Sequence, residues 1–179
     1  MRSLPSNINL KKYESLLKLK NGKKIFLRPI MDSDRHLLVD LFSRMSPQSI
    51  YLRFLRRLDA LPKNMINRLL TIDYHTNFAL VAVANENKAD GIISVARYGN
   101  DPDEDGTELA VAVRDDWQHA GLGKIMLSHV INIAKDNGIT NFTGIMDPQN
   151  SAIQKLLGKL GYEVKYSMES GFYQVEITT

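Results

Sequence analysis

The sequence predicts one α/β domain in which helices flank a mixed central sheet. The chain has 179 residues, which suits a single domain large enough to bury a core. Hydrophobic residues make up 44% of the chain and charged residues 24%, as in ordinary globular proteins. Segments with strand-like and helix-like apolar spacing follow one another in the order β-α-α-α-β-β-β-α-β-α-β-β.

The first half of this pattern holds a strand, three helices and a hairpin. Asn21-Gly22 is a turn signal before the first strand. Asp32 or Ser33 can cap the first helix, and proline is well suited to the starts of the next two. A polar turn joins two apolar runs into the hairpin. We expect strands at 24–30, 78–84 and 91–98, and helices starting near residues 32, 46 and 62.

The second half of the pattern is built around a long amphipathic helix. The strand at 108–113 precedes it, and apolar residues recur at helical spacing from Leu122 onward. Asn137-Gly138 then supplies a stop signal. After it we expect a strand at 141–146, a helix that follows Asn150 and ends at Gly161, and a closing hairpin of 162–169 and 171–177.

The domain organisation follows from where this pattern begins. We expect residues 1–22 to form an N-terminal extension, in which residues 8–19 could form a short amphipathic helix. Residues 23–179 would then form the single domain.

The segment 118–124, with the sequence Gln-His-Ala-Gly-Leu-Gly-Lys, carries most of the functional information. A glycine-rich turn between a strand and a helix directs unpaired N–H groups at one point, which favours a phosphate or pyrophosphate. It is not a nucleoside-triphosphate loop, because Gln118 and Ile125 stand where that loop needs glycine and Ser or Thr. It is not a dinucleotide fingerprint, because Met126 replaces the third glycine or alanine.

The remaining pattern, Gln-x-x-Gly-x-Gly after a strand, resembles the pyrophosphate loop of the GCN5-related N-acetyltransferases (the GNAT superfamily). The order of elements is similar to that fold from about residue 23 to the C-terminus. The resemblance implies that acetyl-CoA lies in a cleft at a splayed central strand, without a metal. The residues that it implies at the donor site are Val111 and Val113 through their backbone, Gln118, His119, Ala120, Gly121, Leu122, Gly123, Lys124 and Asn150.

Three further stretches, 43–54, 72–74 and 79–83, look like the acetyltransferase domain of bacterial protein-lysine acetyltransferases of the Pat type. This resemblance implies that the acceptor is the ε-amine of a protein lysine, for example on an acyl-CoA synthetase. Two alternatives remain open. One is a small-molecule amine as acceptor, and the other is a non-catalytic acyl-CoA-binding module that acts as a sensor or interaction domain.

Glu108 is the candidate general base. Acetyl transfer requires that an ammonium lose a proton and that the thioester oxygen be stabilised. Glu108 starts the apolar strand ten residues before the loop and matches the general-base glutamate of Pat-type enzymes. We expect the cleft to withdraw its carboxylate partly from water. The structural alternative is a strand-edge glutamate that pairs with a nearby cation.

The identity of a general acid is open. Asn150 can cap the helix that follows it, or contact coenzyme A as in the family. Many family members carry a tyrosine seven residues after this asparagine, where Leu157 stands here. Tyr162 and Tyr166 could substitute, although core or strand packing suits both better.

The composition of the chain excludes some reaction mechanisms and argues against several kinds of partner. The chain has no cysteine, which excludes a cysteine acyl-enzyme, and its four histidines lack metal-ligand spacing. The net charge of +3 is dispersed, so we expect no nucleic-acid partner. No apolar run approaches the roughly 20 residues that span a bilayer, so we expect no membrane association and a cytoplasmic location. The acidic run 101–105 and the pair Asp73-Tyr74 could attract or line an acceptor, or serve only as turns.

Overall fold

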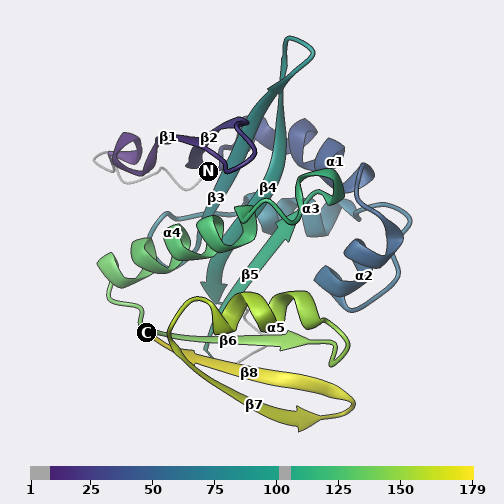
Figure 1. Ribbon diagram of the computed structural model, residues 1–179, viewed down its shortest axis with the longest axis vertical. Coiled ribbons are helices and arrows are strands. Elements are labelled where there is room, and N and C mark those ends of the chain that lie inside the picture. Colours follow the sequence, from purple (N-terminus) through teal and green to yellow (C-terminus); the bar gives the residue numbers. More distant parts are fainter. Residues whose placement is uncertain (1–8, 101–105) are drawn as a thin grey trace.

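An eight-stranded mixed sheet crosses the molecule, with helices on both of its faces (Figure 1). The computed structural model describes residues 9–100 and 106–179. The strands are β1 (Ser15–Lys18), β2 (Lys24–Pro29), β3 (Phe78–Glu86), β4 (Ala89–Asn100), β5 (Thr107–Val113), β6 (Asn141–Met146), β7 (Glu163–Glu169) and β8 (Phe172–Thr178). The helices are α1 (Arg35–Ser43), α2 (Pro47–Phe54), α3 (Lys63–Leu70), α4 (Leu122–Asp136) and α5 (Ser151–Gly158), with 3-10 turns at Leu10–Tyr13, Asp32–Asp34 and Asp115–Trp117.

The strands lie in the order β1-β2-β3-β4-β5-β6-β8-β7. Every neighbouring pair is antiparallel except β5 and β6, which run parallel and are connected through α4. A parallel pair needs such a crossover, because the chain must return to the same end of the sheet. The one parallel pair of strands therefore lies in the middle of the sheet. The chain leaves β5, passes through the predicted phosphate loop and α4, and then enters β6.

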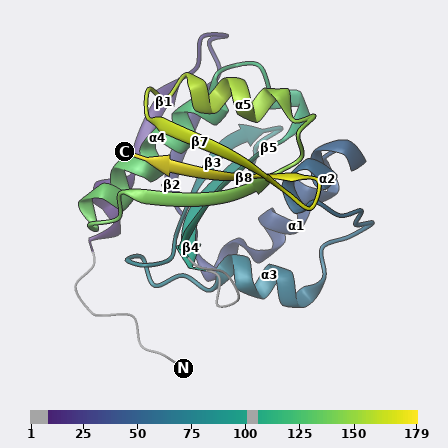
Figure 2. The same cartoon turned by 90° about the horizontal axis from the view of Figure 1, so that it is seen from below.

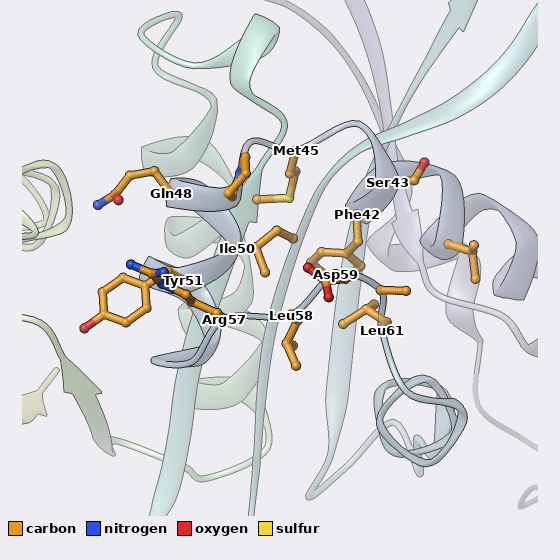
Figure 3. Close-up of a pocket in the computed structure, with 13 residues that line it drawn as sticks. Phe42, Ser43, Met45, Gln48, Ile50, Tyr51, Arg57, Leu58, Asp59 and Leu61 are labelled. Carbon is orange, nitrogen blue, oxygen red and sulfur yellow. The ribbon is translucent and has the colours of Figure 1, made fainter.

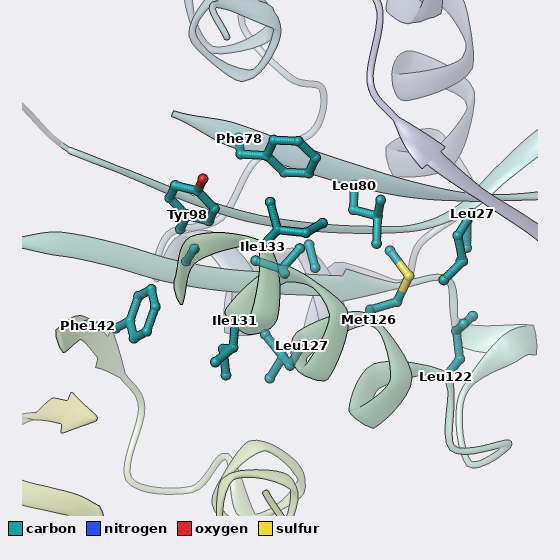
Figure 4. Packing of buried hydrophobic residues seen from close by; sticks show 14 of the residues in the cluster. Leu27, Phe78, Leu80, Tyr98, Leu122, Met126, Leu127, Ile131, Ile133 and Phe142 are labelled. Carbon is teal, nitrogen blue, oxygen red and sulfur yellow. The ribbon is translucent and has the colours of Figure 1, made fainter. Parts of the chain in front are cut away.

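The helices divide between the two faces, as Figure 2 shows. α4 and α5 cover one face, and α1, α2 and α3 cover the other. On the α4 face, Met126, Leu127 and Ile131 pack with Phe78 and Leu80 of β3 (Figure 4). Burial of each such side chain stabilises the fold by roughly 1.5–3 kcal/mol. This packing holds α4, and hence the loop at its start, against the sheet.

The N-terminal segment differs from expectation. The helix that we expected between residues 8 and 19 is wrong for the described part, residues 9–19, which form a 3-10 turn and β1. Hydrogen bonding to β2 offers this segment a partner that sequence periodicity cannot reveal. Leu19 is buried in the core, whereas Leu16 is 71% exposed. The sheet therefore starts inside the range that we assigned to an extension.

The expected order of the elements from residue 24 onward matches the structure. The hairpin of β3 and β4 is tighter than expected, because its strands run on to a turn at Asn87-Lys88. Both residues have positive φ values, 51° and 68°, as in the type I′ turns that suit the twist of hairpins. The acidic run 101–105 lies outside the described residues.

Candidate active site

The central feature of the site is the separation of β5 from β6. The two strands pair at a single position, Glu108 with Thr143, and then diverge. The Arg114 N–H donates to the Ile93 carbonyl of β4 at 2.9 Å. In an antiparallel pair, every second residue of β5 counted back from Arg114 therefore directs its N–H and carbonyl toward β4. Val111 and Val113 fall between them, and their backbone groups face the opening instead.

The loop before α4 is shaped by two backbone positions in the left-handed region. His119 has φ of 62° and Gly121 has φ of 81°. Each glycine of the loop has a reason for its identity within the protein itself. Gly121 has open space around it but a backbone conformation that favours glycine. At Gly123 a Cβ would lie 3.1 Å from Leu156, so this glycine allows α5 to pack closely against α4.

The loop presents a set of backbone donors. Among the described residues, no backbone carbonyl accepts a hydrogen bond from the N–H groups of 119–124. The first such bond at the start of α4 runs from Ile125 N to Gly121 O at 3.2 Å. Leu122 is 1% exposed as a whole residue, so its side chain is covered by the protein. These donors at the positive end of a 15-residue helix can bind a pyrophosphate through the main chain.

Gln118 has a structural role that sequence reasoning missed. Its side-chain amide donates to the Val113 carbonyl at 3.0 Å and to the Asp115 carboxylate at 3.2 Å. Asp115 in turn accepts hydrogen bonds from the Ser46 N–H at 2.8 Å and from the Ser49 hydroxyl. This network joins the N-terminus of α2 to the phosphate loop. The Ser46-Pro47 cap was readable in the sequence, but its partner 69 residues away was not.

A buried ion cluster holds the turn that precedes the loop. Arg114 is fully buried and donates to Glu86 and Asp116 at distances down to 2.6 Å. Its hydrogen bond to each carboxylate lowers the pKa of Glu86 and of Asp116. The hydrogen bond to Asp116, together with that to Glu86, raises the pKa of Arg114. The cluster fixes the position at which the chain leaves β5, and therefore where the loop begins.

Glu108 lies on the face of the sheet that carries α1, α2 and α3. Its side chain is 40% exposed, so the carboxylate is partly withdrawn from water and still accessible. One of its oxygens lies 3.8 Å from the Arg53 guanidinium of α2, which is the cation pairing of the structural alternative. Burial lowers the pKa of Arg53, and the charge of Glu108 opposes that change. The carboxylate thus remains accessible beside a largely buried cation.

The remaining candidates near α5 have structural roles, as a helix cap or in packing. The Asn150 side chain caps α5 by accepting from Ile153 N at 3.3 Å. Leu157 is 5% exposed and belongs to the core. Tyr162 packs against the core, and the Tyr166 ring contacts Tyr173 with its pKa raised by burial.

Asp73 and Tyr74 are used within the approach to β3. The Asp73 carboxylate accepts from the backbone N–H groups of residues 75–77 at 2.8 Å. The Tyr74 hydroxyl donates to the Ile30 carbonyl at 2.9 Å, and burial raises its pKa. These contacts match the plainer prediction of a turn after a helix.

A hollow of about 710 Å³ lies between α1, α2 and the segment that follows α2 (Figure 3). Phe42, Ile50, Leu58 and Leu61 contribute apolar side chains to it, and Tyr51 stands at its edge. None of the predicted donor-site residues lines it.

Within residues 9–100 and 106–179 no group of three His, Cys, Asp or Glu side chains could hold a metal ion. The same residues contain no helix that is both long and apolar enough to span a bilayer.

Comparison with known proteins places this geometry in a family. Residues 24–163 match the acetyltransferase (GNAT) domain. The chain is 28% identical over 144 residues to acetyltransferase PA5475 of Pseudomonas aeruginosa, a match that covers 80% of this chain and 77% of that protein. It is 25% identical over 146 residues to acetyltransferase Pat of Mycolicibacterium smegmatis, covering 81% of this chain but only 43% of that protein.

Solved structures agree with this assignment. The GNAT domain of S. lividans PAT superposes with a TM-score of 0.82 at 26% identity, covering 94% of this chain and 98% of that one. YncA from Salmonella typhimurium, solved with acetyl-CoA, shares the fold with a TM-score of 0.65 at 18% identity, covering 86% and 93%. The chain belongs to the GNAT acetyltransferases, and it is an acetyl-CoA-dependent acyltransferase.

Proposed function

We propose that this acetyltransferase transfers the acetyl group of acetyl-CoA to the ε-amine of a protein lysine, with Glu108 as general base. The observation that carries the proposal is the opening between β5 and β6. Glu108 marks its closed end, and the free N–H groups of 119–124 lie beyond the C-terminal end of β5. One opening thus offers an anion-binding loop and an accessible carboxylate.

The donor would be held mainly by backbone groups. The N–H groups of 119–124 would bind the pyrophosphate, and the backbone of Val111 and Val113 would hydrogen-bond the arm that carries the thioester. Asn150 would contact the coenzyme next to its capping bond. We further propose that residues 23–179 carry the whole site.

The transfer would proceed by direct attack in a ternary complex. The acceptor ammonium gives a proton to Glu108, and the neutral amine then attacks the thioester carbon. A C–N bond forms and the C–S bond breaks, so that the coenzyme A sulfur leaves as a thiolate. The nitrogen then loses its second proton to give the amide, and the thiolate takes up a proton to give the coenzyme A thiol. The absence of cysteine from the sequence is consistent with direct attack, since no cysteine acyl-enzyme can form.

The choice of a protein lysine rests on likeness to the Pat proteins. The 26% identity to the GNAT domain of S. lividans PAT extends over 94% of this chain, and therefore includes the α1–α3 side of the sheet. An acyl-CoA synthetase is the acceptor that the sequence resemblance suggests. Acceptor clefts vary widely within one fold, so the substrate has to be tested directly.

The test combines a substrate survey with a base variant. The chain is incubated with labelled acetyl-CoA and either cell extract or a panel of small amines. Label in discrete protein bands supports a protein acceptor, and label only in small molecules contradicts it. Glu108→Gln should lower kcat by about 10²–10³-fold, because it removes the proton acceptor but keeps the shape of the side chain.

Glu169→Gln is the matched control, since it makes the same chemical change on an exposed glutamate at the far edge strand β7. It should keep the wild-type kcat. Acetyl-CoA affinity should be unchanged in both variants. A Glu108→Gln enzyme with full kcat would show that the base is assigned to the wrong residue.

A further inference from the structure

Helix α2 contacts both the donor loop and the candidate base. Its N-terminal residues Ser46 and Ser49 hydrogen-bond to Asp115, which also holds the phosphate loop through its bond to the Gln118 side chain. Near its C-terminal end, Arg53 pairs with Glu108. A change in the position of α2 would therefore reach both halves of the site.

A third contact of α2 crosses the opening itself. The Tyr51 hydroxyl donates to the Asp147 carboxylate at 2.9 Å. Asp147 directly follows β6, whereas α2 packs on the β5 side, and β5 and β6 pair only at Glu108 and Thr143. Within the described part of the chain, no other hydrogen bond joins α2 to the segment between β6 and α5. Figure 3 shows the Tyr51 ring directed away from the apolar side chains of the hollow.

Asp147 connects Tyr51 to the start of α5 through further hydrogen bonds. Its second carboxylate oxygen accepts from Gln149 N at 2.8 Å, and its carbonyl accepts from Asn150 N at 2.9 Å. Asn150 then caps α5. The hydrogen bond to Asp147 raises the pKa of Tyr51, so the phenol stays protonated and continues to donate near neutral pH. One hydroxyl thus restrains the whole turn 147–150.

We propose that Tyr51 is a positioning residue for acetyl transfer: through Asp147 it holds the turn 147–150 against α2 and sets the width of the opening on the acceptor side. The inference rests on the proposed function, because it takes the acceptor to enter between α2 and that turn. The main anchor of the donor, the loop 119–124, lies outside this contact. Loss of the hydrogen bond between Tyr51 and Asp147 should therefore impair use of the acceptor much more than binding of acetyl-CoA.

The experiment compares Tyr51→Phe, Asp147→Asn and the double variant with the wild-type chain. Each single variant should lower kcat/KM for the acceptor by about five- to tenfold, which lies within the range expected for one typical intramolecular hydrogen bond. The double variant should lose no more than the worse single variant, because both changes remove the same contact. The Kd for acetyl-CoA should rise by less than kcat/KM falls, because Asn150 is the only proposed donor contact in the turn 147–150 and the backbone donors of 119–124 are unchanged.

Hydrogen exchange supplies a readout that does not need activity. In Tyr51→Phe the amides of Gln149 and Asn150, which donate to Asp147, should exchange faster, while those of α4 stay protected. Tyr74→Phe is the matched control: it also removes one bonded hydroxyl, here from the Ile30 carbonyl, but it does not bridge the opening. It should keep wild-type kcat/KM and wild-type exchange at 147–150.

Strictly additive losses, an unchanged kcat/KM in Tyr51→Phe, or an equal loss in Tyr74→Phe would overturn the proposal. So would unchanged exchange at 147–150. A wild-type chain that acetylates no acceptor would instead contradict the proposed function. That failure is distinguishable, because the exchange of 147–150 would still respond to Tyr51→Phe.

Discussion

The two sides of the opening between β5 and β6 differ in their chemical groups: backbone N–H groups line one side, and side chains line the other. The proposed donor side, residues 114–125, consists of backbone donors in a loop that the ion cluster around the buried Arg114 holds in place. The proposed acceptor side consists of the side chains of Tyr51, Arg53 and Glu108, together with the turn at Asp147. One side depends on local chain geometry, and the other on contacts between segments that are far apart in the sequence.

This difference explains why the donor side has a recognisable motif and the acceptor side does not. A backbone site needs particular residue types only where the chain must turn or pack closely, as at Gly121 and Gly123. A side-chain site can be assembled from any residues that the fold brings together. Substitutions should therefore affect stability and donor binding on one side, and acceptor kinetics on the other.

The largest effect is expected at the arginine of the donor side. Arg114→Met leaves Glu86 and Asp116 without their buried cation, and should lower the free energy of unfolding by about 2–4 kcal/mol. Arg53→Met is the matched change on the acceptor side, where the ion pair is longer at 3.8 Å and Glu108 is 40% exposed. It should lower the free energy of unfolding by at most about 1 kcal/mol and mainly alter acceptor kinetics.

Urea unfolding, with KM for both substrates, measures the contrast. Equal losses of stability in the two arginine variants would remove the distinction between a buried anchor and an exposed pair.

An intermediate effect is expected at the left-handed glycine of the loop. Gly121→Ala places a Cβ in open space but at φ of 81°, so the loss should be about 1–2 kcal/mol of stability, from backbone strain alone. Acetyl-CoA affinity should fall with it as the loop shifts. Calorimetry of acetyl-CoA binding and thermal unfolding together measure both changes.

Gly158→Ala provides the comparison, because a Cβ there also meets open space and its φ is not positive. Alanine is favoured in a helix, so this variant should be neutral or slightly more stable. If the two alanine variants behaved alike, backbone conformation would not be the reason for glycine at 121.

The smallest effect is expected when an exposed side chain of the donor loop is removed. If the pyrophosphate is bound by the backbone, Lys124→Ala should weaken acetyl-CoA binding only about threefold, as for one screened charge. The loss should shrink further in high salt. A loss above roughly tenfold would mean that the Lys124 side chain is a principal ligand of the phosphate, contrary to the backbone site.

Local signals were sufficient for most of the fold. The cap at Asn150 lies where the sequence predicted it, because a cap acts on the next turn of its own chain. The predicted cap of the first helix at Asp32 or Ser33 was wrong, because a 3-10 turn at Asp32–Asp34 precedes α1. Strand β1 was missed, because its leucines have no distinct period and its pairing partner β2 decides its conformation. The neighbour of the Glu108 carboxylate could not be named from the sequence, because Arg53 lies far from it along the chain.

The sequence by itself determined the order of the elements from residue 24 onward and the family, and it predicted the donor loop, since each depends on short-range patterns of apolar residues and glycines. Only the tertiary structure decided what surrounds Glu108 and what spans the opening. Arg53 and Tyr51 reach Glu108 and Asp147 across 55 and 96 positions of the chain, and each contact exists only once the sheet has formed. Side-chain sites of this kind depend on packing between distant segments, which no local pattern encodes.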